Sequence, residues 1–498
     1  MRPAFAEAHG NLGIALKEAG QLDEAIVSFR QAIALKPAFR EACGNLGNAL
    51  KDQGRLEEAT AAYRHAIALH PDFTDAHSNL LLNLNYHPAY DARAIADELA
   101  RWNRQHAEPL HRFIQPHLND PDPNRRLRIG YVSADFHTHA SALFLMPLLQ
   151  HHDAQQVEVF CYAEVLGPDA ITGRFQQLVP QWRSTVGLSD AQVAQQIRAD
   201  RIDILVDLKL HTAHNRLLVF AHKPAPVQAT WLGYPGSTGL TTIDYRLSDP
   251  HLDPPGLDES VYSERTLRLP DTFWCYDPLD GRDLPVSPLP ALANGFITFG
   301  CLNNFSKVND AVLRLWSSIL QAVPSSRLLL LAPEGSHRAQ ALQLLQEGAG
   351  GRVAPQRIEF VTLRPRRQYL ELYHRIDLAL DTFPCNGHTT SFDSFWMGVP
   401  VLTLPGPTAM GRAGLSQLIN LNLPELIAQS PAHYARIAAA LADDLPRLAE
   451  LRAALRGRMQ QSPLMDAPRF ARNIEAAYRQ MWQKHGLTRN PADPVLVA

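Results

Sequence analysis

The feature that most constrains this chain is a 34-residue period near its N-terminus. Pro3, Pro37 and Pro71 stand 34 residues apart, and Asn11, Asn45 and Asn79 keep the same spacing. The same interval relates further pairs of apolar, small and turn-forming residues: Leu12 and Leu46, Gly13 and Gly47, Gly20 and Gly54, Ala25 and Ala59, and Phe29 and Tyr63. A fixed period of this length predicts repeated helix pairs that stack into an α-solenoid, because a single pair cannot bury its apolar face.

Glycines fall where such a helix pair needs them. Gly13 and Gly47 permit two helices to approach closely, whereas Gly20 and Gly54 fall between paired helices, where the chain must turn. With a proline at the close of each unit, this is the tetratricopeptide pattern. We assign residues 1–88 to tetratricopeptide repeats.

The repeats also predict a binding surface. Asn11, Asn45 and Asn79 form a ladder on the concave face that could grip an extended peptide backbone. The chain opens almost directly on a repeat, without the polar capping helix that usually closes such an array. We therefore expect the array either to continue upstream or to pack on another molecule, including a second copy of the chain.

Charge and composition exclude several classes of partner. The chain has 498 residues, with 47 Lys and Arg against 50 Asp and Glu, so no strongly basic field recruits nucleic acid. No polybasic or amphipathic segment suggests a membrane anchor, and the apolar run from Leu328 to Ala332 is far below the roughly 18 residues that span a bilayer. A partner must be recognised through a specific site.

Cysteine usage points to a reducing compartment. Cys43, Cys161, Cys275, Cys301 and Cys385 are scattered without Cys-x-x-Cys spacing, which argues against a disulfide framework or a structural zinc site. The N-terminus also lacks a basic-then-apolar signal. We expect a soluble, cytoplasmic protein.

After the repeats the pattern changes twice. A helical linker over 89–125 ends in a Pro- and Asp-rich stretch, and short apolar strands then alternate with helical segments in two series, 126–284 and 285–487, before a tail at 488–498. Alternating strands and helices predict two Rossmann-like lobes with mostly parallel sheets. Two such lobes are the architecture of GT-B glycosyltransferases, with a ligand crevice at the strand carboxyl ends.

The segment 381–393 carries the clearest chemical signal. It follows the buried strand 376–380, and Pro384 and Gly387 force a turn before a predicted helix N-terminus with three hydroxyl side chains, Thr389, Thr390 and Ser391. The unpaired N–H groups and the dipole of a helix N-terminus favour phosphate binding. Asp393, four residues after Thr389, projects from the same helical face and could accept hydrogen bonds from a ribose.

No metal site is predicted. Asp120-Pro-Asp122 has the Asp-x-Asp form of a metal-binding pair, but it lies in the polar linker with no apolar strand before it, so we interpret it as a turn. No other dense cluster of metal ligands is present in the sequence. The positive charge for a diphosphate must then come from the protein, and Lys307 lies at the mouth of the same lobe as the phosphate turn.

Several motifs, taken in order, resemble the O-linked N-acetylglucosamine transferases over nearly the whole chain. They are Gly130-Tyr-Val-Ser-Ala-Asp-Phe136 with His139, Lys223-Pro-Ala-Pro-Val-Gln228 with Trp231-Leu-Gly-Tyr-Pro-Gly236, Asn303-Asn-Phe-Ser-Lys307, and the segment 381–393. The resemblance implies an inverting, metal-free transfer from UDP-N-acetylglucosamine (UDP-GlcNAc) to Ser or Thr of polypeptides recognised by the repeats. Only about 30 residues, 265–295, separate the lobes, which resembles bacterial members.

The resemblance also implies roles on the donor side. Lys307 is expected to hold the diphosphate, with Asn304 as its polar neighbour. The other donor-side residues are His388, Thr389 and Thr390 for the diphosphate, Asp393 for the ribose, Arg364, Arg366 and Tyr369 for the uracil, and Cys385 beside the sugar. Thr389 or Thr390 would also suit a helix N-cap, and Tyr369 stands where relatives often have His.

On the acceptor side, His139 follows the first strand of the first lobe. Its near-neutral pKa suits a general base, and the resemblance implies that role, with a donor phosphate or a bound water as rivals. Gly233 and Pro235 would set a tight loop that lines the sugar pocket.

Two other functions stay open. One is the same fold with another donor, such as GDP-fucose or UDP-glucose. The other is a tetratricopeptide scaffold with vestigial lobes, against which Lys307, the hydroxyl triplet and Asp393 argue together.

Overall fold

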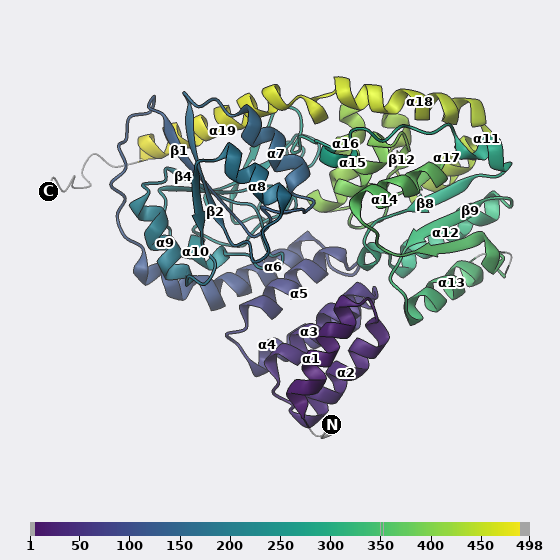
Figure 1. The fold of residues 1–498 in the computed structure, drawn as a ribbon, viewed down its shortest axis with the longest axis horizontal. Helices are drawn as coiled ribbons and strands as arrows, with labels where there is room; N and C mark the ends of the chain where they lie inside the picture. The colour runs from purple at the N-terminus through teal and green to yellow at the C-terminus, as the bar shows by residue number, and fades with distance from the viewer. Residues whose placement is uncertain (1–4, 349, 352, 489–498) are drawn as a thin grey trace. The chain divides into compact units, whose positions relative to one another are not determined.

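The structure, a computed structural model, describes residues 5–348, 350–351 and 353–488 (Figure 1). Pro3 and the tail from residue 489, both included in the assignments above, lie outside these residues. The chain divides into two units. The first contains Met1–Ile95 and Pro278–Ser462, and the second contains Ala96–Asp277 and Pro463–Ala498.

The predicted helix pairs are present in the first unit. They are α1 (Ala6–Glu18), α2 (Leu22–Leu35), α3 (Arg40–Asp52), α4 (Leu56–Leu69) and α5 (Thr74–Tyr86). A Cβ atom at Gly47 would lie 2.4 Å from the Tyr63 ring, so only glycine lets α3 and α4 pack this closely. Gly54 turns the chain between them at φ +75°. The α-solenoid is therefore confirmed, and it continues into α5 although the sequence pattern weakens after Ala76.

The same unit holds a five-stranded parallel sheet in the order β10-β9-β8-β11-β12. Its strands are β8 (Thr298–Cys301), β9 (Arg327–Leu331), β10 (Ile358–Val361), β11 (Leu378–Leu380) and β12 (Val401–Leu402). Its helices are α11 (Pro290–Asn294), α12 (Asp310–Ala322), α13 (Ser336–Gly348), α14 (Arg366–Glu371), α15 (Thr389–Trp396), α16 (Ala413–Asn420), α17 (Pro431–Asp443) and α18 (Leu445–Gln461). The second predicted Rossmann-like lobe is confirmed.

The second unit holds a seven-stranded parallel sheet in the order β3-β2-β1-β4-β5-β6-β7. Its strands are β1 (Leu127–Ser133), β2 (Val157–Ala163), β3 (Gln181–Ser184), β4 (Ile204–Asp207), β5 (Val227–Thr230), β6 (Tyr245–Ser248) and β7 (Arg265–Arg268). Its helices include α7 (Ala142–His151), α8 (Ala170–Leu178), α9 (Asp190–Ala199), α10 (Leu217–Ala221) and α19 (Ala467–Thr488). The sequence did not predict β3, β6 and β7. The edge strands β3 and β7 are only partly buried and lack an apolar run.

The linker is helical at α6 (Ala92–Trp102) and in the two short helical turns that follow, η1 (Asn103–Ala107) and η2 (Glu108–Phe113). One domain boundary differs from the one expected. The chain after Ser462 returns to the first lobe, whereas we had assigned residues up to 487 to the second. Figure 1 shows α19 beside α7, and the Tyr478 hydroxyl lies 3.0 Å from that of Tyr131 in β1. The apolar side of α19 packs against the first lobe. The sequence of α19 alone does not show which lobe it packs against.

The repeats are tied to the second lobe by a carboxylate. The backbone N–H and the hydroxyl of Ser336, which begins α13, each donate to Asp23 in α2 at 2.6 Å. Gln53 donates to the same carboxylate at 2.7 Å. A carboxylate at this position satisfies an unpaired helix N–H and interacts favourably with the helix dipole. Burial raises the pKa of Asp23, but the hydrogen bonds from Ser336 and Gln53 outweigh it and hold the pKa below its usual value.

Replacing Asp23 by Ala should destabilise the start of α13 by about 1 kcal/mol. Amides of residues 336–343 are then expected to exchange about fivefold faster, as measured by hydrogen exchange at neutral pH. Because the folded-state pKa of Asp23 is lowered, its contribution is complete above about pH 4 and is lost as the pH falls through the folded-state value.

Glu24→Ala is the matched control. It removes the neighbouring exposed carboxylate, which makes no hydrogen bond or ion pair with any described residue. Equal exchange rates in the two variants would show that the cap contributes no stability.

Candidate active site

Each sheet places polar residues where its strand order reverses. From β8 the chain proceeds to β9 and β10 on one side of the second sheet, and then to β11 and β12 on the other. From β1 it proceeds to β2 and β3, and then to β4 on the other side. Open parallel sheets bind ligands beside the carboxyl ends of the strands at such a reversal. The segments after β8, β11, β1 and β4 therefore define two candidate half-sites, one in each unit.

Lys307 follows β8 at the end of a short 3₁₀ turn, η4 (Phe305–Lys307). Asn304 begins this turn, because its side chain accepts a hydrogen bond from the Ser306 N–H at 3.1 Å. The Lys307 Nζ donates to the carbonyl oxygen of Asn386 at 2.6 Å. The structure thus brings Lys307 and Asn304 to the turn after β11.

The turn after β11 leads directly into α15. The turn packs closely against the start of α15 at Gly387, where a Cβ atom would lie 2.4 Å from the Ser391 hydroxyl. Thr390 donates its hydroxyl to the Asn303 side chain, whereas the hydroxyl of half-buried Thr389 has no partner among the described residues. The helix N-terminus, the Thr389 hydroxyl and the Lys307 ammonium together suit a bound diphosphate.

Two buried groups that the sequence analysis did not single out shape this turn. Asp381 directly follows β11 and accepts hydrogen bonds from the Thr403 hydroxyl at 2.7 Å and the Gly387 N–H at 2.6 Å. Burial raises the pKa of Asp381 to about 6, against the lowering effect of those hydrogen bonds and of Lys307. Asn303 donates to the Thr382 hydroxyl at 2.9 Å. A polar residue immediately after an apolar strand is the signal that could have identified both.

Cys385 is buried and His388 is half-buried beside Lys307. Burial lowers the pKa of His388 to about 3, with a further contribution from the Lys307 charge, so the imidazole is neutral at pH 7. Its Nε2 lies 3.2 Å from the Met410 carbonyl, which assigns the ring proton to that nitrogen. Burial also raises the pKa of the Cys385 thiol. Cys385 therefore lines the turn as a neutral thiol.

The residues expected at the nucleoside are only partly brought together. Asp393 in α15 is buried, and both of its oxygens accept hydrogen bonds from Arg366, at 2.5 and 2.6 Å. The guanidinium of Arg366 also lies 5.9 Å from the centroid of the Tyr369 ring. Arg364 is exposed and makes no ion pair with a described residue.

Tyr369 is packed inside the lobe. Its hydroxyl lies 3.0 Å from that of Tyr373, which donates to the Thr390 carbonyl at 2.8 Å. Burial raises the pKa of the Tyr369 hydroxyl above its usual value. These bonds connect Tyr369 to the start of α15 and so to the phosphate turn.

In the first lobe, His139 lies beside an ion pair. Its Nδ1 is 3.4 Å from Asp135 Oδ2, and the other Asp135 oxygen accepts a hydrogen bond from Lys209 Nζ at 2.6 Å. The His139 side chain is 42% exposed and so only partly removed from solvent. This partial burial lowers the pKa of His139, Asp135 opposes the effect, and Lys209 and His137 add to it. The Ser141 N–H donates to His139 Nδ1 at 3.2 Å, which favours the neutral ring with its proton on Nε2.

Lys209 was not predicted as a site residue. It follows Asp207 at the end of β4, and Asp207 shapes this loop by accepting hydrogen bonds from the Lys209 N–H at 3.1 Å and the Leu210 N–H at 2.9 Å. Burial raises the pKa of Asp207 to about 6. The Lys209 side chain is only 6% exposed, and burial of a lysine beside a histidine and a carboxylate is visible only in three dimensions.

The predicted loop of Gly233 and Pro235 packs on the same segment. A Cβ atom at Gly233 would lie 2.6 Å from the Lys209 carbonyl oxygen, so the residue must be glycine. Pro235 is buried. The structure therefore places both residues next to the Lys209 loop.

The asparagine ladder has the expected periodic placement. Asn11, Asn45 and Asn79 occupy equivalent positions in α1, α3 and α5, and each is exposed or half-buried. None of the three side chains makes a hydrogen bond with a described residue. Their amides are therefore available to a ligand.

The Asp-x-Asp motif forms a turn, as interpreted above. Asp120 accepts a hydrogen bond from the Asp122 N–H at 3.0 Å, and Asp122 accepts one from the Asn124 N–H at 2.9 Å. Across residues 5–348, 350–351 and 353–488, no three His, Cys, Asp or Glu side chains gather as metal ligands.

Over the same described ranges, no helix has the length and apolar character to cross a membrane.

Comparison with known proteins identifies the family. Residues 70–280 and 289–474 match the profile of glycosyl transferase family 41, and residues 6–39 and 47–80 match tetratricopeptide repeat profiles. The chain belongs to glycosyltransferase family 41. A solved structure of a Thermobaculum terrenum O-GlcNAc transferase mutant superposes with a TM-score of 0.91 at 40% identity, over 98% of this chain and 92% of that one.

Two plant proteins are also similar to this chain. A Petunia hybrida protein named a probable UDP-N-acetylglucosamine–peptide N-acetylglucosaminyltransferase SPINDLY is 42% identical over 375 residues, which are 74% of this chain and 40% of that protein. An Arabidopsis thaliana protein with the same activity in its name, SEC, is 32% identical over 376 residues, which are 74% of this chain and 38% of that protein. The chain spans about two fifths of the length of these curated relatives.

Replacing Lys209 by Met should raise the pKa of His139, because it removes a nearby positive charge and frees Asp135 to face the imidazole. The titration is measured by NMR on ¹³C-labelled histidine, with the His139 signal assigned from its loss in His139→Gln.

Lys223→Met serves as the control. Lys223 is also largely buried in the first lobe, but it pairs with Asp244 at 2.5 Å, so its removal should leave the pKa of His139 unchanged. An unchanged or lowered pKa in Lys209→Met would contradict the proposed influence of Lys209.

Proposed function

We propose that this chain transfers N-acetylglucosamine from UDP-GlcNAc to Ser and Thr hydroxyls of polypeptides, in an inverting and metal-independent reaction. The observation that carries the proposal is the convergence of the Lys307 ammonium with the N-terminal turn of α15 at the reversal of the second sheet. Two phosphates that leave with negative charge need positive groups already in place, and such electrostatic stabilisation is usually the largest contribution to catalysis. The names of the relatives support this donor and a peptide acceptor.

The donor side would use groups of this lobe alone. Lys307 neutralises charge on the leaving diphosphate, and Asn304 fixes the turn that aims it. Thr389 and Thr390 face the same phosphates with the first N–H groups of α15. His388 contributes a neutral hydrogen-bonding group, because its pKa of about 3 keeps it uncharged. Cys385 would border the sugar.

The nucleoside would bind beside the pair of Asp393 and Arg366. A ribose hydroxyl that reaches Asp393 must share the carboxylate with the guanidinium, which already uses both oxygens. Arg364 and Tyr369 complete the proposed uracil site, with Arg364 free to move towards a base.

Metal independence follows in this proposal from the supply of positive charge. The Lys307 ammonium and the α15 dipole take the place that a divalent cation holds in metal-dependent glycosyltransferases. The Asp120 and Asp122 carboxylates are already engaged by backbone N–H groups.

His139 would act on the acceptor hydroxyl, in the pocket lined by Gly233 and Pro235. A general base must present an unprotonated nitrogen, and here the Nδ1 nitrogen already accepts from the Ser141 N–H. Action through Nε2 requires the opposite tautomer, in which Nδ1–H donates to Asp135 across the present 3.4 Å. A donor phosphate or a water molecule could take the proton instead.

The repeats would select the polypeptide. The unpaired amides of Asn11, Asn45 and Asn79 have the donors and acceptors needed to bind peptide backbone groups at a regular interval. Self-association through the repeats and action in the cytoplasm complete the proposal. The five cysteines are buried and free, as a reducing compartment requires.

Lys307→Met should lower the rate of transfer from UDP-GlcNAc by about 10²- to 10³-fold, since it removes a fixed charge at the leaving group. His139→Ala should lower it by about 10²-fold or more, as for loss of a proton-transfer group. Radiolabelled sugar incorporation into an acceptor polypeptide measures both. Lys17→Met is the control, because Lys17 is a half-buried lysine of the repeats that pairs with Asp52 at 3.3 Å and has no proposed role at the donor. Full activity in both site variants would refute these roles.

Thermal unfolding with nucleotides tests the donor directly. UDP, GDP, UDP-GlcNAc, UDP-glucose and GDP-fucose are each added with and without a chelator. A ligand at about 100 times its dissociation constant should add about 2.7 kcal/mol of stability. We expect a shift with uridine ligands, largest for UDP-GlcNAc, that survives chelation.

The other outcomes separate the alternatives. A shift with guanosine ligands alone would favour the fucose donor, and a larger shift with UDP-glucose than with UDP-GlcNAc would favour glucose. A shift that the chelator abolishes would contradict metal independence, and no shift at all would favour a scaffold with vestigial lobes.

A further inference from the structure

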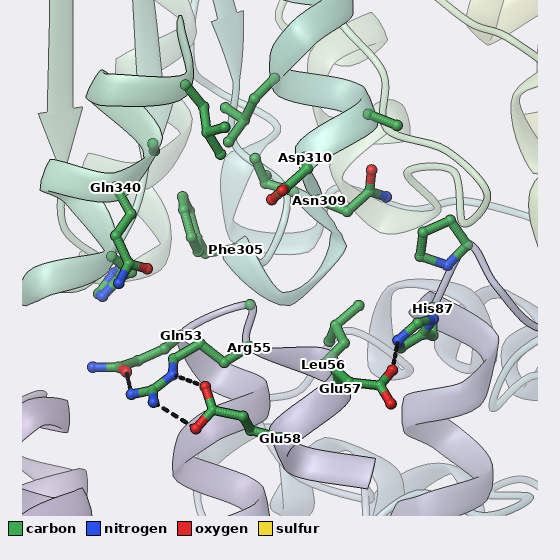
Figure 2. Close-up of a pocket in the computed structure, with 18 of the residues that line it drawn as sticks. Gln53, Arg55, Leu56, Glu57, Glu58, His87, Phe305, Asn309, Asp310 and Gln340 are labelled. Carbon is green, nitrogen blue, oxygen red and sulfur yellow. Dashed lines mark hydrogen bonds and ion pairs between the residues drawn. The ribbon is translucent and has the colours of Figure 1, made fainter. Parts of the chain in front are cut away.

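A cavity of about 580 Å³ lies inside the first unit, between the repeats and the second lobe (Figure 2). Its walls come from the turn between α3 and α4, the residues after α5, the 3₁₀ turn η4, and parts of α12 and α13. Neither Lys307 nor any residue of the asparagine ladder lines it. It is therefore distinct from both sites proposed above.

The centre of the cavity is apolar. In Figure 2, Leu56 projects into it from the repeats and Phe305 from the second lobe. Other aliphatic residues extend this surface, namely Val308, Leu313, Ala341 and Leu344. Such a surface can accept a single large apolar side chain. Anchor side chains buried in pockets of this kind supply much of the binding energy at protein interfaces.

The rim of the cavity is polar, and several of its side chains form no ion pair or hydrogen bond with a described residue. Asp310 and Arg314 are exposed, lie one turn apart on α12, and form no ion pair with a described residue. The exposed Gln340 amide has no hydrogen-bond partner among the described residues either. In contrast, Arg55 is held by Glu58 in two hydrogen bonds of 2.7 Å.

The charge of the lining decides between ligand classes. The lining includes the carboxylates of Glu57, Glu58 and Asp310 and the guanidiniums of Arg55 and Arg314. Glu58 is held by Arg55, and Glu57 lies 2.9 Å from His87 Nε2, whereas Asp310 has no ion-pair partner among the described residues. An anion such as a phosphate would meet this excess of carboxylates and find only Arg314 unpaired. A cationic side chain would pair with Asp310, while backbone N–H and C=O groups would satisfy Gln340 and Arg314.

We propose that this cavity docks an extended polypeptide segment in which an apolar side chain stands next to a basic one. The apolar side chain fills the space between Leu56 and Phe305, and the basic one pairs with Asp310. This inference goes beyond the proposed function, because docking here needs neither the nucleotide nor the asparagine ladder.

The position of the cavity gives docking a consequence for the donor site. Phe305 belongs to the same 3₁₀ turn as Lys307. Asn309 also lines the cavity, and its side chain donates to the Phe383 carbonyl in the phosphate turn at 2.6 Å. A docked polypeptide therefore contacts the segment that carries the diphosphate lysine.

Fluorescence anisotropy tests the docking with the full chain and no nucleotide. The probes are fluorescein-labelled nonapeptides of Gly and Ser with Leu, Phe, Met or Trp next to Lys at the centre. At least one should bind saturably, and replacing its apolar residue by Ser or its Lys by Glu should each weaken binding at least about tenfold. Absence of saturable binding by every probe up to about 1 mM would overturn the proposal.

Matched variants locate the binding. Ala311→Trp fills the cavity from an exposed lining position and should weaken binding at least about tenfold. Gln321→Trp, on an exposed part of α12 outside the cavity, should leave it unchanged. Asp310→Asn should reduce the preference for Lys over Glu.

Two results would place the peptide elsewhere and overturn the proposal. One is unchanged binding in Ala311→Trp, and the other is binding lost in an Asn45→Ala, Asn79→Ala double variant but kept in Ala311→Trp. Because these measurements use no donor, they are independent of the nucleotide-binding result. A cooperative thermal unfolding transition of Ala311→Trp without nucleotide, at the temperature of the unchanged protein, shows that the variant is folded.

Discussion

The two half-sites depend on a buried carboxylate placed in the same way in each sheet. Asp207 ends β4 and Asp381 follows β11, each on the strand that adjoins the reversal of strand order. Each accepts hydrogen bonds from backbone N–H groups of the loop that follows and from a threonine hydroxyl. Thr230 ends the neighbouring strand β5, and Thr403 directly follows the neighbouring strand β12. Burial raises the pKa of both to about 6, so the charge is costly and the loops must supply these donors. The carboxylates thereby fix the loops that carry Lys209 and the phosphate turn.

Positive charge is arranged differently in the two half-sites. Lys307 donates to a backbone carbonyl and stays available to an anion, whereas Lys209 is buried against Asp135 and acts on His139 through that carboxylate. The first arrangement suits stabilisation of a leaving group, because the ammonium contacts a neutral carbonyl and forms no ion pair with a described residue. The second arrangement suits control of a proton. The Lys209 charge lowers the pKa of His139, and Lys209 also competes with His139 for the Asp135 carboxylate that would orient the imidazole ring.

Much of the fold and part of the site could be predicted from the sequence. Periodicity revealed the repeats and most strands, and the order of motifs led to Lys307, His139 and the phosphate turn. The sequence analysis missed Asn303, Lys209 and the role of Asp381, because each acts through a partner distant in the chain. It placed Arg364 and Arg366 together, yet Arg366 hydrogen-bonds Asp393 whereas Arg364, two residues earlier, is exposed to solvent. Which of two nearby arginines turns towards the lobe is decided by tertiary packing. The strands β3, β6 and β7 were also missed, two of them because partly buried edge strands carry little apolar signal.

By itself, the sequence determined the local elements, because helix and strand periodicity, turn residues and spacing act over short distances. It therefore specified a tetratricopeptide solenoid, two α/β lobes and a helix start suited to phosphate. The tertiary structure decided which distant elements meet. Asp23 caps α13, α19 returns to the first lobe, and the repeats and second lobe enclose a cavity beside Phe305. Such contacts depend on complementary surfaces and on the pairing of buried polar groups, and neither property belongs to any single segment of the chain.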